Sequence, residues 1–290
     1  MSQSEIIRPD EIFIDENLIE EFKKISQTII NESKSETKQK LCEIIKNNTN
    51  NGIFPNIGLD QTNEQIRQEF AKFTNEKIIP NAQKWHLNDE LIPISIIDEM
   101  SELGVFGLTI PEEYGGLGLS KTAMCIVSEE LSRGWIGTGS LGTRADIAAE
   151  LILVGGNEYQ KKKFLPEIAR GKILPTAVFS EPDIGSDLAH LKTRAILNGN
   201  NYEVIGNKTW ITHGSRANLM TMLVRTKKDI DDHNGLSILL AEKTSGNQDD
   251  PFPDENIKGG EIDVIGYRGM KEYDIAFEGF KVPSDHLLGD

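Results

Sequence analysis

Apolar positions repeat with a helical spacing through the middle of the chain and with a strand spacing after it. Between about residues 62 and 170 they fall three or four residues apart, as on one face of an amphipathic helix. After Pro175 the spacing shortens to two, which places alternate side chains on one face of a strand. The pattern therefore predicts an α+β chain, with an all-α helical domain followed by a small antiparallel β-barrel or sandwich domain.

Several of the expected helices carry recognisable start signals. Thr62 and Gln65 fit a capping box at the start of the first one. Pro93 suits the first turn of a second helix. Asn157, with Gln160 three residues later, begins the last, which runs to about residue 170. The others are expected at about 120–133 and 138–154.

Seven strand candidates follow the helices, and turn signals separate some of them. The candidates are residues 192–197, 202–206, 208–212, 219–225, 236–242, 261–266 and 273–280. Asn198-Gly199-Asn200-Asn201 and Gly206-Asn207 have the composition of hairpin turns. The helical domain is expected to cover 61–175 and the β domain 176–290.

An extension precedes the helical domain. Residues 1–60 are expected to form a helical extension followed by a linker. One apolar stripe at helical spacing consists of Leu18, Phe22, Ile25 and Ile29. The polar residues 31–40 indicate a solvated segment, and residues 47–55 indicate the linker. The pattern indicates no function for this extension.

Charge and hydropathy narrow the functional classes. The 290 residues carry a formal charge of -15, which argues against nucleic-acid or anionic-membrane partners. No apolar run approaches the ~18 residues that a membrane-spanning helix needs. The N-terminus lacks the features of a signal peptide and of a mitochondrial presequence, so we expect a cytoplasmic protein.

The cysteines and histidines do not form recognisable sites. Cys42 and Cys125 lie far apart without C-x-x-C spacing, so we expect two buried thiols in a reducing compartment. The histidines are scattered singly, and no metal site is expected.

The run Gly137-Thr138-Gly139-Ser140-Leu141-Gly142 fits the dinucleotide fingerprint G-x-G-x-x-G. That fingerprint requires a strand immediately before it, whereas the preceding dozen residues here have helical periodicity. We therefore interpret these glycines as sites of close helix packing or of room for a ligand at the helix surface.

Two segments give the strongest indication of chemistry. Residues 179–188 form a loop that is broken by glycine and proline and rich in hydroxyl groups, which suits a phosphate or a flat heteroaromatic ring. About 20 residues later, the alternation in 208–212 directs Trp210 and Thr212 to one face. An aromatic ring for packing and hydroxyl donors for orientation fit a flavin site.

From about residue 62 onward the chain resembles the acyl-CoA dehydrogenase family. The matching segments are 110–118, 155–166, Ser180-Glu181-Pro182 with Gly185-Ser186-Asp187, Trp210-Ile211-Thr212, and Val282-Pro283 with Leu287-Leu288-Gly289. The resemblance implies an FAD-dependent enzyme that oxidises an acyl-CoA thioester between its α and β carbons. It also implies an electron-transferring flavoprotein as acceptor and a homo-oligomer, a dimer or tetramer.

The resemblance assigns cofactor contacts to positions of this chain. It implies that Phe179 and Ser180 contact the isoalloxazine, and that Gly185 and Ser186 lie at the cofactor pyrophosphate and the acyl-CoA entrance. The strand Trp210-Ile211-Thr212 would follow the flavin, with Trp210 packed on the ring and Thr212 near its N5 edge. Four positions depart from the family: Ser180 stands where threonine is common, Ile184 where a small residue is usual, and Phe179 and His190 are also atypical.

No catalytic base is assigned to this chain. In the family the base is a glutamate on a C-terminal helical bundle, which is expected beyond Asp290. The loop carboxylates Glu112 and Glu181 are not promoted to that role. Residues 1–290 alone are therefore expected to be inactive. Another short-chain or branched-chain dehydrogenase, an oxidase, and a non-catalytic flavin- or CoA-binding module remain as alternatives.

Within the family, the run 259–273 and the Asp250-Pro251-Phe252-Pro253 segment resemble the methylsuccinyl-CoA dehydrogenase branch. This resemblance implies oxidation of (2S)-methylsuccinyl-CoA to mesaconyl-CoA in the ethylmalonyl-CoA pathway. Such a substrate needs a cation for its free carboxylate. Ile136, Ser140 and Arg144 share one helix face. Ser140 and Arg144 are the candidates for this contact; the alternative for Arg144 is a surface or interhelix ion pair.

Overall fold

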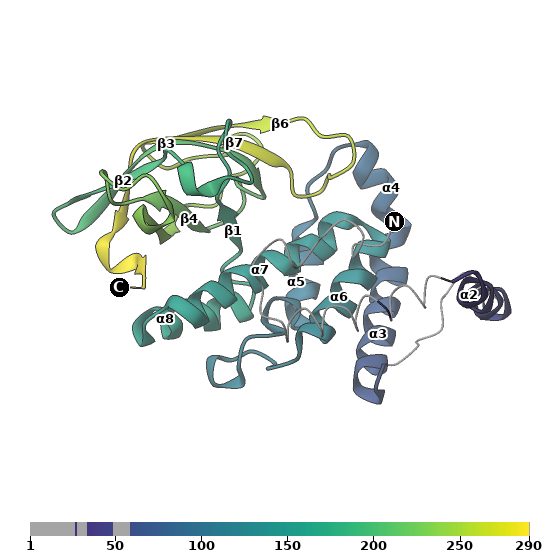
Figure 1. Ribbon diagram of the computed structural model, residues 1–290. Coiled ribbons are helices and arrows are strands. Elements are labelled where there is room, and N and C mark those ends of the chain that lie inside the picture. Colours follow the sequence, from purple (N-terminus) through teal and green to yellow (C-terminus); the bar gives the residue numbers. More distant parts are fainter. Residues whose placement is uncertain (1–26, 28–33, 49–58, 290) are drawn as a thin grey trace. The chain divides into compact units, whose positions relative to one another are not determined.

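The computed structural model describes residues 27, 34–48 and 59–289 (Figure 1). The chain divides into two compact units, residues 1–59 and 60–290. In the first unit, α2 (Ser35–Asn48) is a helix whose described side chains are exposed, so part of the predicted solvated segment 31–40 is helical. The predicted stripe at Leu18, Phe22, Ile25 and Ile29 lies outside the described residues, as does most of the predicted linker.

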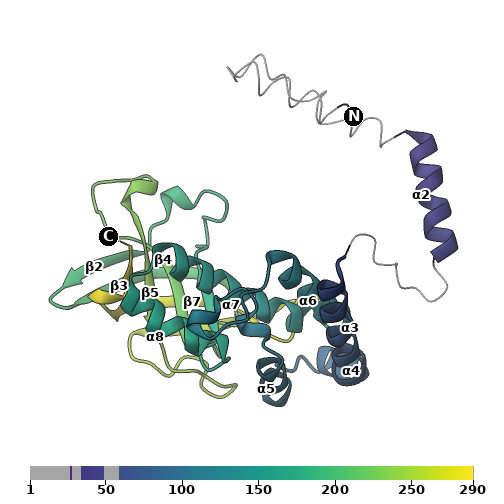
Figure 2. The ribbon, with the colours of Figure 1, turned by 90° about the horizontal axis from the view of Figure 1, so that it is seen from below.

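The second unit begins with the predicted helical domain. Its helices are α3 (Gln61–Phe73), α4 (Ile79–Leu87), α5 (Ile94–Glu102), α6 (Lys121–Gly134), α7 (Ile136–Gly155) and α8 (Glu158–Ala169). A helical domain followed by a β domain confirms the predicted fold class. Figure 2 shows α3 at one end of this unit and the strands at the other, with α7 between them.

Side-chain caps set the helix starts. The predicted helix start at Asn157 is confirmed, and Asn157 and Gln160 form a capping box there in α8. The predicted box at Thr62 is wrong, because the carboxylate of Asp60 caps α3 instead and accepts a hydrogen bond of 2.8 Å from the backbone N–H of Asn63. Aspartate is as good an N-cap as threonine or better, and it comes first in the chain.

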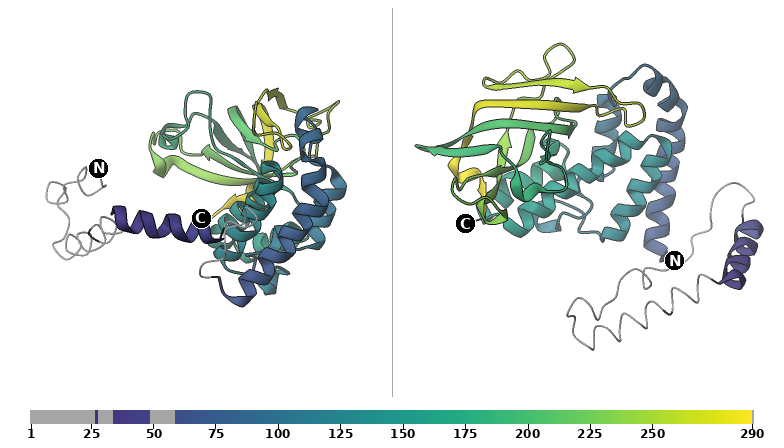
Figure 3. Two further views of the ribbon diagram at one scale, coloured as in Figure 1. Left: turned by 90° about the vertical axis from the view of Figure 1, so that its right-hand side faces the viewer. Right: turned by 45° about the horizontal axis from the view of Figure 1, so that its top comes forward.

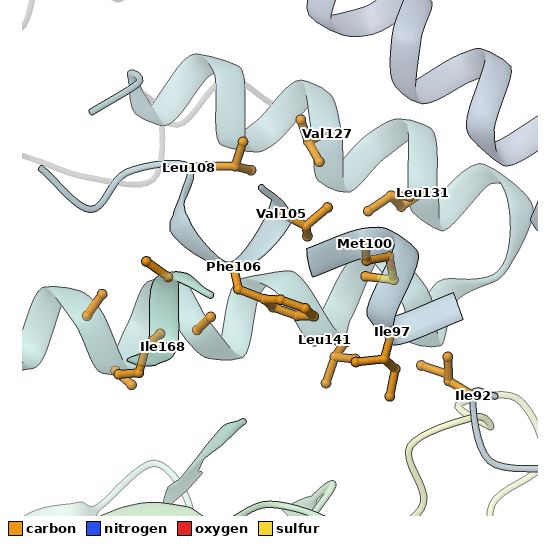
Figure 4. Packing of buried hydrophobic residues seen from close by; sticks show 14 of the residues in the cluster. Ile92, Ile97, Met100, Val105, Phe106, Leu108, Val127, Leu131, Leu141 and Ile168 are labelled. Carbon is orange, nitrogen blue, oxygen red and sulfur yellow. The ribbon is translucent and has the colours of Figure 1, made fainter. Parts of the chain in front are cut away.

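The helices enclose one apolar core. Figure 4 shows Met100, Phe106 and Leu141 pointing toward one another from separate segments, and all three are buried. The glycines of the 137–142 run allow α7 to approach its neighbours, since a Cβ on Gly139 would lie 2.0 Å from the hydroxyl oxygen of Ser132. Helix α6 precedes this run, which confirms its interpretation as helix packing.

The β domain is a mixed sheet of eight strands (Figure 3). They are β1 (Pro175–Val178), β2 (Arg194–Asn198), β3 (Asn201–Thr212), β4 (Leu219–Arg225), β5 (Leu236–Glu242), β6 (Ile257–Ile262), β7 (Glu272–Pro283) and β8 (Leu287–Leu288). The order is β6-β7-β3-β2-β4-β5-β8, and β1 pairs with β4. Most pairs are antiparallel, as predicted, but β1 and β2 pair with β4 in parallel.

Two turn predictions have different outcomes. The β2–β3 hairpin is confirmed, since Asn198 pairs with Asn201 and Gly199 has a φ of 61°. The turn predicted at Gly206-Asn207 is wrong, because β3 runs through it with register shifts on either side. Gly206 is needed there for space, since a Cβ would lie 2.5 Å from the hydroxyl oxygen of Thr193. Strand β1 was not predicted, and β6 begins and ends earlier than expected.

The β6–β7 connection, residues 263–271, leaves the sheet and packs against the helices (Figure 1). The backbone carbonyl of Gly269 accepts a hydrogen bond of 2.7 Å from the N–H of Ile92. Arg268 donates to the carbonyl of His86 at 2.8 Å, and Met270 is part of the helical core. This connection brings Tyr267 beside α7.

The predicted burial of both cysteines is wrong, because Cys42 and Cys125 are exposed. On α6 the neighbouring Ile126 and Val127 take the inward positions and leave Cys125 on the outer face. No described helix has the length and apolar character that crossing a membrane requires. Within the described ranges there is also no group of three or more His, Cys, Asp or Glu side chains suited to a metal ion.

Candidate functional site between the helical and β domains

A buried ion pair anchors the 179–188 loop to the sheet. The carboxylate of Glu181 accepts hydrogen bonds from the backbone N–H groups of Lys192 at 2.7 Å and Thr193 at 2.9 Å. The ammonium of Lys208 lies 3.1 Å from the same carboxylate and donates to the carbonyl of Phe179 at 2.8 Å. Both charged side chains are buried, so each depends on the other.

This environment gives Glu181 a structural role. Burial alone raises the pKa of Glu181, but the hydrogen bonds of Lys192 and Thr193 and the charge of Lys208 outweigh it and hold the pKa below its ordinary value. Burial lowers the pKa of Lys208 to about 8 against the opposing effect of Glu181. A carboxylate engaged in this way is not available to remove a substrate proton.

Strand β3 is bent where it meets this loop. Trp210 has a φ of 56° and His213 a φ of 64°, both in the left-handed region that costs a non-glycine residue of order 1–3 kcal/mol. A register shift against β7 lies between Lys208 and Ile211, so the simple alternation expected across this segment is interrupted. At this bulge Trp210 is 58% exposed, whereas Ile211 and Thr212 are buried.

The loop and the strand together fit a flavin nucleotide. The backbone N–H of Thr209 donates to the carbonyl of Ser180 at 3.0 Å, which places the Ser180 loop beside the exposed Trp210 ring. In the described part of the chain, no group accepts a hydrogen bond from the backbone N–H of Gly185 or Ser186. Both residues are exposed, so these amides are available to a phosphate. The unusual Ile184 is buried beneath the loop and pairs with Glu181.

A second cluster joins α7 to the β domain. We call Ser140, Arg144, Thr212, Tyr267 and Glu272 the Arg144 network. The guanidinium of Arg144 donates to the hydroxyl of Thr212 at 3.1 Å and to that of Tyr267 at 3.3 Å. The hydroxyls of Ser140 and Tyr267 are also hydrogen-bonded. Thr212 in turn donates to the carboxyl group of Glu272 at 3.0 Å.

The Arg144 network contains buried polar atoms that lack partners. Among the described residues these are Nε of Arg144, Oε1 of Glu272 and both ring nitrogens of the adjacent His213. Neither the surface nor the interhelix ion pair considered for Arg144 forms, and no carboxylate in the described part lies within ion-pair distance of it. A partly buried guanidinium without a directly paired carboxylate is a suitable partner for an anionic group of a ligand.

Burial shifts the pKa values of two neighbours of Arg144, Glu272 and His213. Burial raises the pKa of Glu272, and the hydrogen bond from Thr212 and the charge of Arg144 oppose this only in part. Burial, together with the positive charges of Arg216, Lys243 and Arg144, lowers the pKa of His213 to about 3. Both shifts favour the neutral form, the raised pKa for Glu272 and the lowered pKa for His213.

The structure brings together three of the sequence candidates, Ser140, Arg144 and Thr212. Ile136, one turn earlier on α7, is 47% exposed and makes no part of the Arg144 network. Sequence reasoning missed Tyr267 and Glu272 as site residues. Tyr267 lies in the run that carried the resemblance to a family branch, but its spacing gave no sign of a contact with α7.

Known proteins resemble this chain in the sequence and in the fold of its two domains. Residues 60–172 match the acyl-CoA dehydrogenase N-terminal domain, and residues 176–280 match the middle domain of the same family. The (2S)-methylsuccinyl-CoA dehydrogenase of Cereibacter sphaeroides is 55% identical over 252 residues, which are 87% of this chain and 46% of that protein. The chain spans about half the length of the curated relatives it matches.

Solved structures agree with these sequence matches. The acyl-CoA dehydrogenase of Geobacillus kaustophilus superposes with a TM-score of 0.72 at 29% identity, over 80% of this chain and 59% of that one. A glutaryl-CoA dehydrogenase in complex with glutaryl-CoA superposes with a TM-score of 0.73 at 29% identity, over 81% of this chain and 58% of that one.

Proposed function

The chain belongs to the acyl-CoA dehydrogenase family, and on that basis we propose that it acts in the FAD-dependent α,β-dehydrogenation of an acyl-CoA with a second, free carboxylate. The substrate we propose is (2S)-methylsuccinyl-CoA, with mesaconyl-CoA as product. One observation carries this choice: the guanidinium of Arg144 sits at Thr212 without a carboxylate partner among the described residues.

Two relatives support a dicarboxylic acyl group. The relative that is 55% identical is named for (2S)-methylsuccinyl-CoA, and a structural neighbour binds glutaryl-CoA. Both acyl groups end in a free carboxylate. A guanidinium is suited to that group because its planar donors match two carboxylate oxygens, and we assign this contact to Arg144 and Ser140.

FAD is the cofactor of this family, and when bound it would supply an acceptor for the hydride from the β-carbon of the substrate. We propose that Trp210 packs on its ring system and that Phe179, Ser180, Ile211 and Thr212 line it. The free amides of Gly185 and Ser186 suit the pyrophosphate. In this proposal the ring system lies near Arg144, because Thr212 also belongs to the Arg144 network. We propose that Ser186 also contacts the acyl-CoA.

No catalytic base is assigned among the described residues. Glu181 is held by Lys208 and two amides, and Glu272 is only 3% exposed. Glu112 is exposed in a short turn of 3₁₀ helix, Glu112–Tyr114. We further propose, by analogy with the family, that an electron-transferring flavoprotein accepts the electrons and that the protein forms a homo-oligomer.

Ligand binding to the FAD-loaded chain tests the proposal without requiring turnover. The wild type should bind methylsuccinyl-CoA more tightly than butyryl-CoA, which lacks the second carboxylate. Arg144→Ala should weaken methylsuccinyl-CoA binding about tenfold or more, as expected for a lost charge-assisted hydrogen bond, and leave butyryl-CoA binding unchanged. Arg133→Ala is a matched control, because Arg133 pairs with Glu130 on α6.

An unchanged preference in Arg144→Ala would contradict the proposed carboxylate contact. Anaerobic addition of methylsuccinyl-CoA then tests the chemistry separately from binding. Loss of flavin absorption would show that these residues complete the reaction. Binding without that loss would favour the alternative of a non-catalytic flavin- and CoA-binding module for residues 1–290.

A further inference from the structure

Glu272 is a buried carboxyl group that is separated from Arg144 by one hydroxyl. It stands at the start of β7 directly opposite Thr212 of β3, and it is 3% exposed. Thr212 links the two, since its oxygen accepts from Arg144 at 3.1 Å and its hydroxyl lies 3.0 Å from Glu272. The second oxygen of Glu272 has no partner among the described residues.

This link can persist in both protonation states of Glu272. A hydroxyl carries one proton and two lone pairs. When Glu272 is ionised, Thr212 donates its proton to the carboxylate and accepts from Arg144. When Glu272 is neutral, its own proton can be donated to Thr212, which then accepts from both sides. The geometry is kept, but the charge beside Arg144 changes.

Few other charges face Glu272 in the described part of the chain. Arg144 approaches from α7 through Thr212, and its other partner Tyr267 comes from the β6–β7 connection. His213 follows β3, and its pKa is lowered to about 3, mainly by burial. The neighbouring Lys271 is directed away toward Asp89 and Glu261, at 3.3 Å and 2.8 Å. The charge of Arg144 is therefore balanced either by Glu272 or by an anion that enters.

We propose that Glu272 determines the charge specificity of the acyl pocket by competing with the substrate's free carboxylate for Arg144. A neutral Glu272 leaves Arg144 to the substrate, and an ionised Glu272 satisfies Arg144 and repels a second carboxylate. The proposal rests on the proposed function, because it requires that Arg144 binds the acyl carboxylate. Burial supports it by raising the pKa of Glu272 and so favouring the neutral form.

The competition couples substrate binding to a proton. A ligand that favours neutral Glu272 must raise the pKa of that group, so methylsuccinyl-CoA should bind with proton uptake. Butyryl-CoA has no second carboxylate and should bind without it. For the same reason the preference for methylsuccinyl-CoA should be greatest at low pH and should fall as Glu272 ionises.

Isothermal titration of the FAD-loaded chain measures both effects. We would titrate each CoA ester between about pH 6 and pH 8.5, where the substrate carboxylate remains ionised, in two buffers of different ionisation enthalpy. In the wild type the ratio of the two affinities should fall as the pH rises and Glu272 ionises, because one coupled proton changes an affinity by up to about tenfold per pH unit. In Glu272→Gln the ratio should be flat and proton uptake should vanish.

The surface variant Glu278→Gln is the matched control, because the Glu278 side chain is 57% exposed on the same strand and pairs with Lys258. It should behave as the wild type. Proton uptake in Glu272→Gln equal to that of the wild type would overturn the proposal. If Glu272→Gln does not fold, the wild type alone decides, since a pH-independent ratio without proton uptake overturns the proposal equally.

The same titrations separate this inference from the proposed function. If the wild type prefers methylsuccinyl-CoA and Arg144→Ala loses that preference, the carboxylate contact holds whatever Glu272→Gln does. If the wild type shows no preference at any pH and Arg144→Ala changes nothing, the proposed function fails, and the role of Glu272 fails with it.

Discussion

Arg144 and Thr212 are 68 positions apart in the chain and share a hydrogen bond of 3.1 Å between α7 and β3. The backbone of Thr212 is fixed in turn, because the hydroxyl of Thr176 on β1 donates to its carbonyl at 2.6 Å. The β domain thus positions a cation that belongs to a helix. Changes in β3 should therefore alter ligand binding as strongly as changes in α7.

Trp210→Gly should separate flavin binding from stability. Glycine adopts the left-handed φ of 56° without cost, and the ring is 58% exposed, so the melting temperature should stay the same or rise. Loss of ring packing should weaken FAD binding by about tenfold, as expected for an aromatic contact worth ~1.5 kcal/mol. Fluorescence titration with FAD measures this. Leu197→Ala, at a residue 56% exposed on β2, is the control, and equal FAD affinity in both variants would contradict the assignment of Trp210.

Lys208→Met should destabilise the fold strongly. It leaves the buried carboxylate of Glu181 without its cation, and removing one partner of such a pair costs on the order of 3–5 kcal/mol. Urea unfolding measures the free energy. Lys258→Met removes a surface pair with Glu278 and should cost no more than about 1 kcal/mol. Similar losses in the two variants would show that the buried pair is not an anchor.

His213 should make the free energy of unfolding decrease as the pH falls. The unfolded side chain takes up a proton as the pH falls below about 6.5, whereas in the folded chain the pKa is lowered to about 3 by burial. Between these values the free energy of unfolding should lose about 1.4 kcal/mol per pH unit from this group.

His213→Asn should remove that contribution, and asparagine tolerates the φ of 64°. Urea unfolding at several pH values between about 6 and 4 gives the slope for each variant. His190→Asn, at an exposed histidine, should keep the wild-type slope. A slope in His213→Asn equal to that of the wild type would contradict a buried neutral His213.

Gly139→Ala should disturb the packing of α7 on α6. The new Cβ would lie 2.0 Å from the hydroxyl oxygen of Ser132 and 2.6 Å from the backbone carbonyl of Ser128, and the second atom cannot rotate away. Overpacking of this kind costs about 1–3 kcal/mol. Gly260→Ala is the control, since a Cβ there meets no atom within 4 Å. Thermal unfolding compares the two, and equal melting temperatures would refute the close approach.

Local signals were read correctly from the sequence where a few adjacent residues decide the structure. The capping box of Asn157 and Gln160 involves a single turn of helix, and the hairpin at Gly199 a single pair of strands. Gly206 was misread because its reason is contact with Thr193 on a neighbouring segment rather than a turn. Asp60 displaced Thr62 because both residue types can cap, and spacing alone does not rank them.

For the site, too, some residues could be predicted from local signals, whereas the contacts between distant segments could not. Arg144 and Thr212 were each identified from their own segments, but nothing in the sequence predicted that they touch. Glu272 meets Thr212 through the register of β3 and β7, and Tyr267 reaches Arg144 because the β6–β7 connection folds back on the helices. Contacts between residues 60 or 123 positions apart depend on this tertiary pairing and have no local signature.

Met270 belongs to the apolar core of the helices although it follows six strands of the sheet in the chain. A helical fragment that stops before β1 would therefore lack one of its own core side chains and would expose a hole where Met270 packs. The strands, expressed alone, would carry the same methionine into water. Heating or denaturant should consequently melt the helices and the sheet in one cooperative transition, and neither half should serve as a separate building block for engineering.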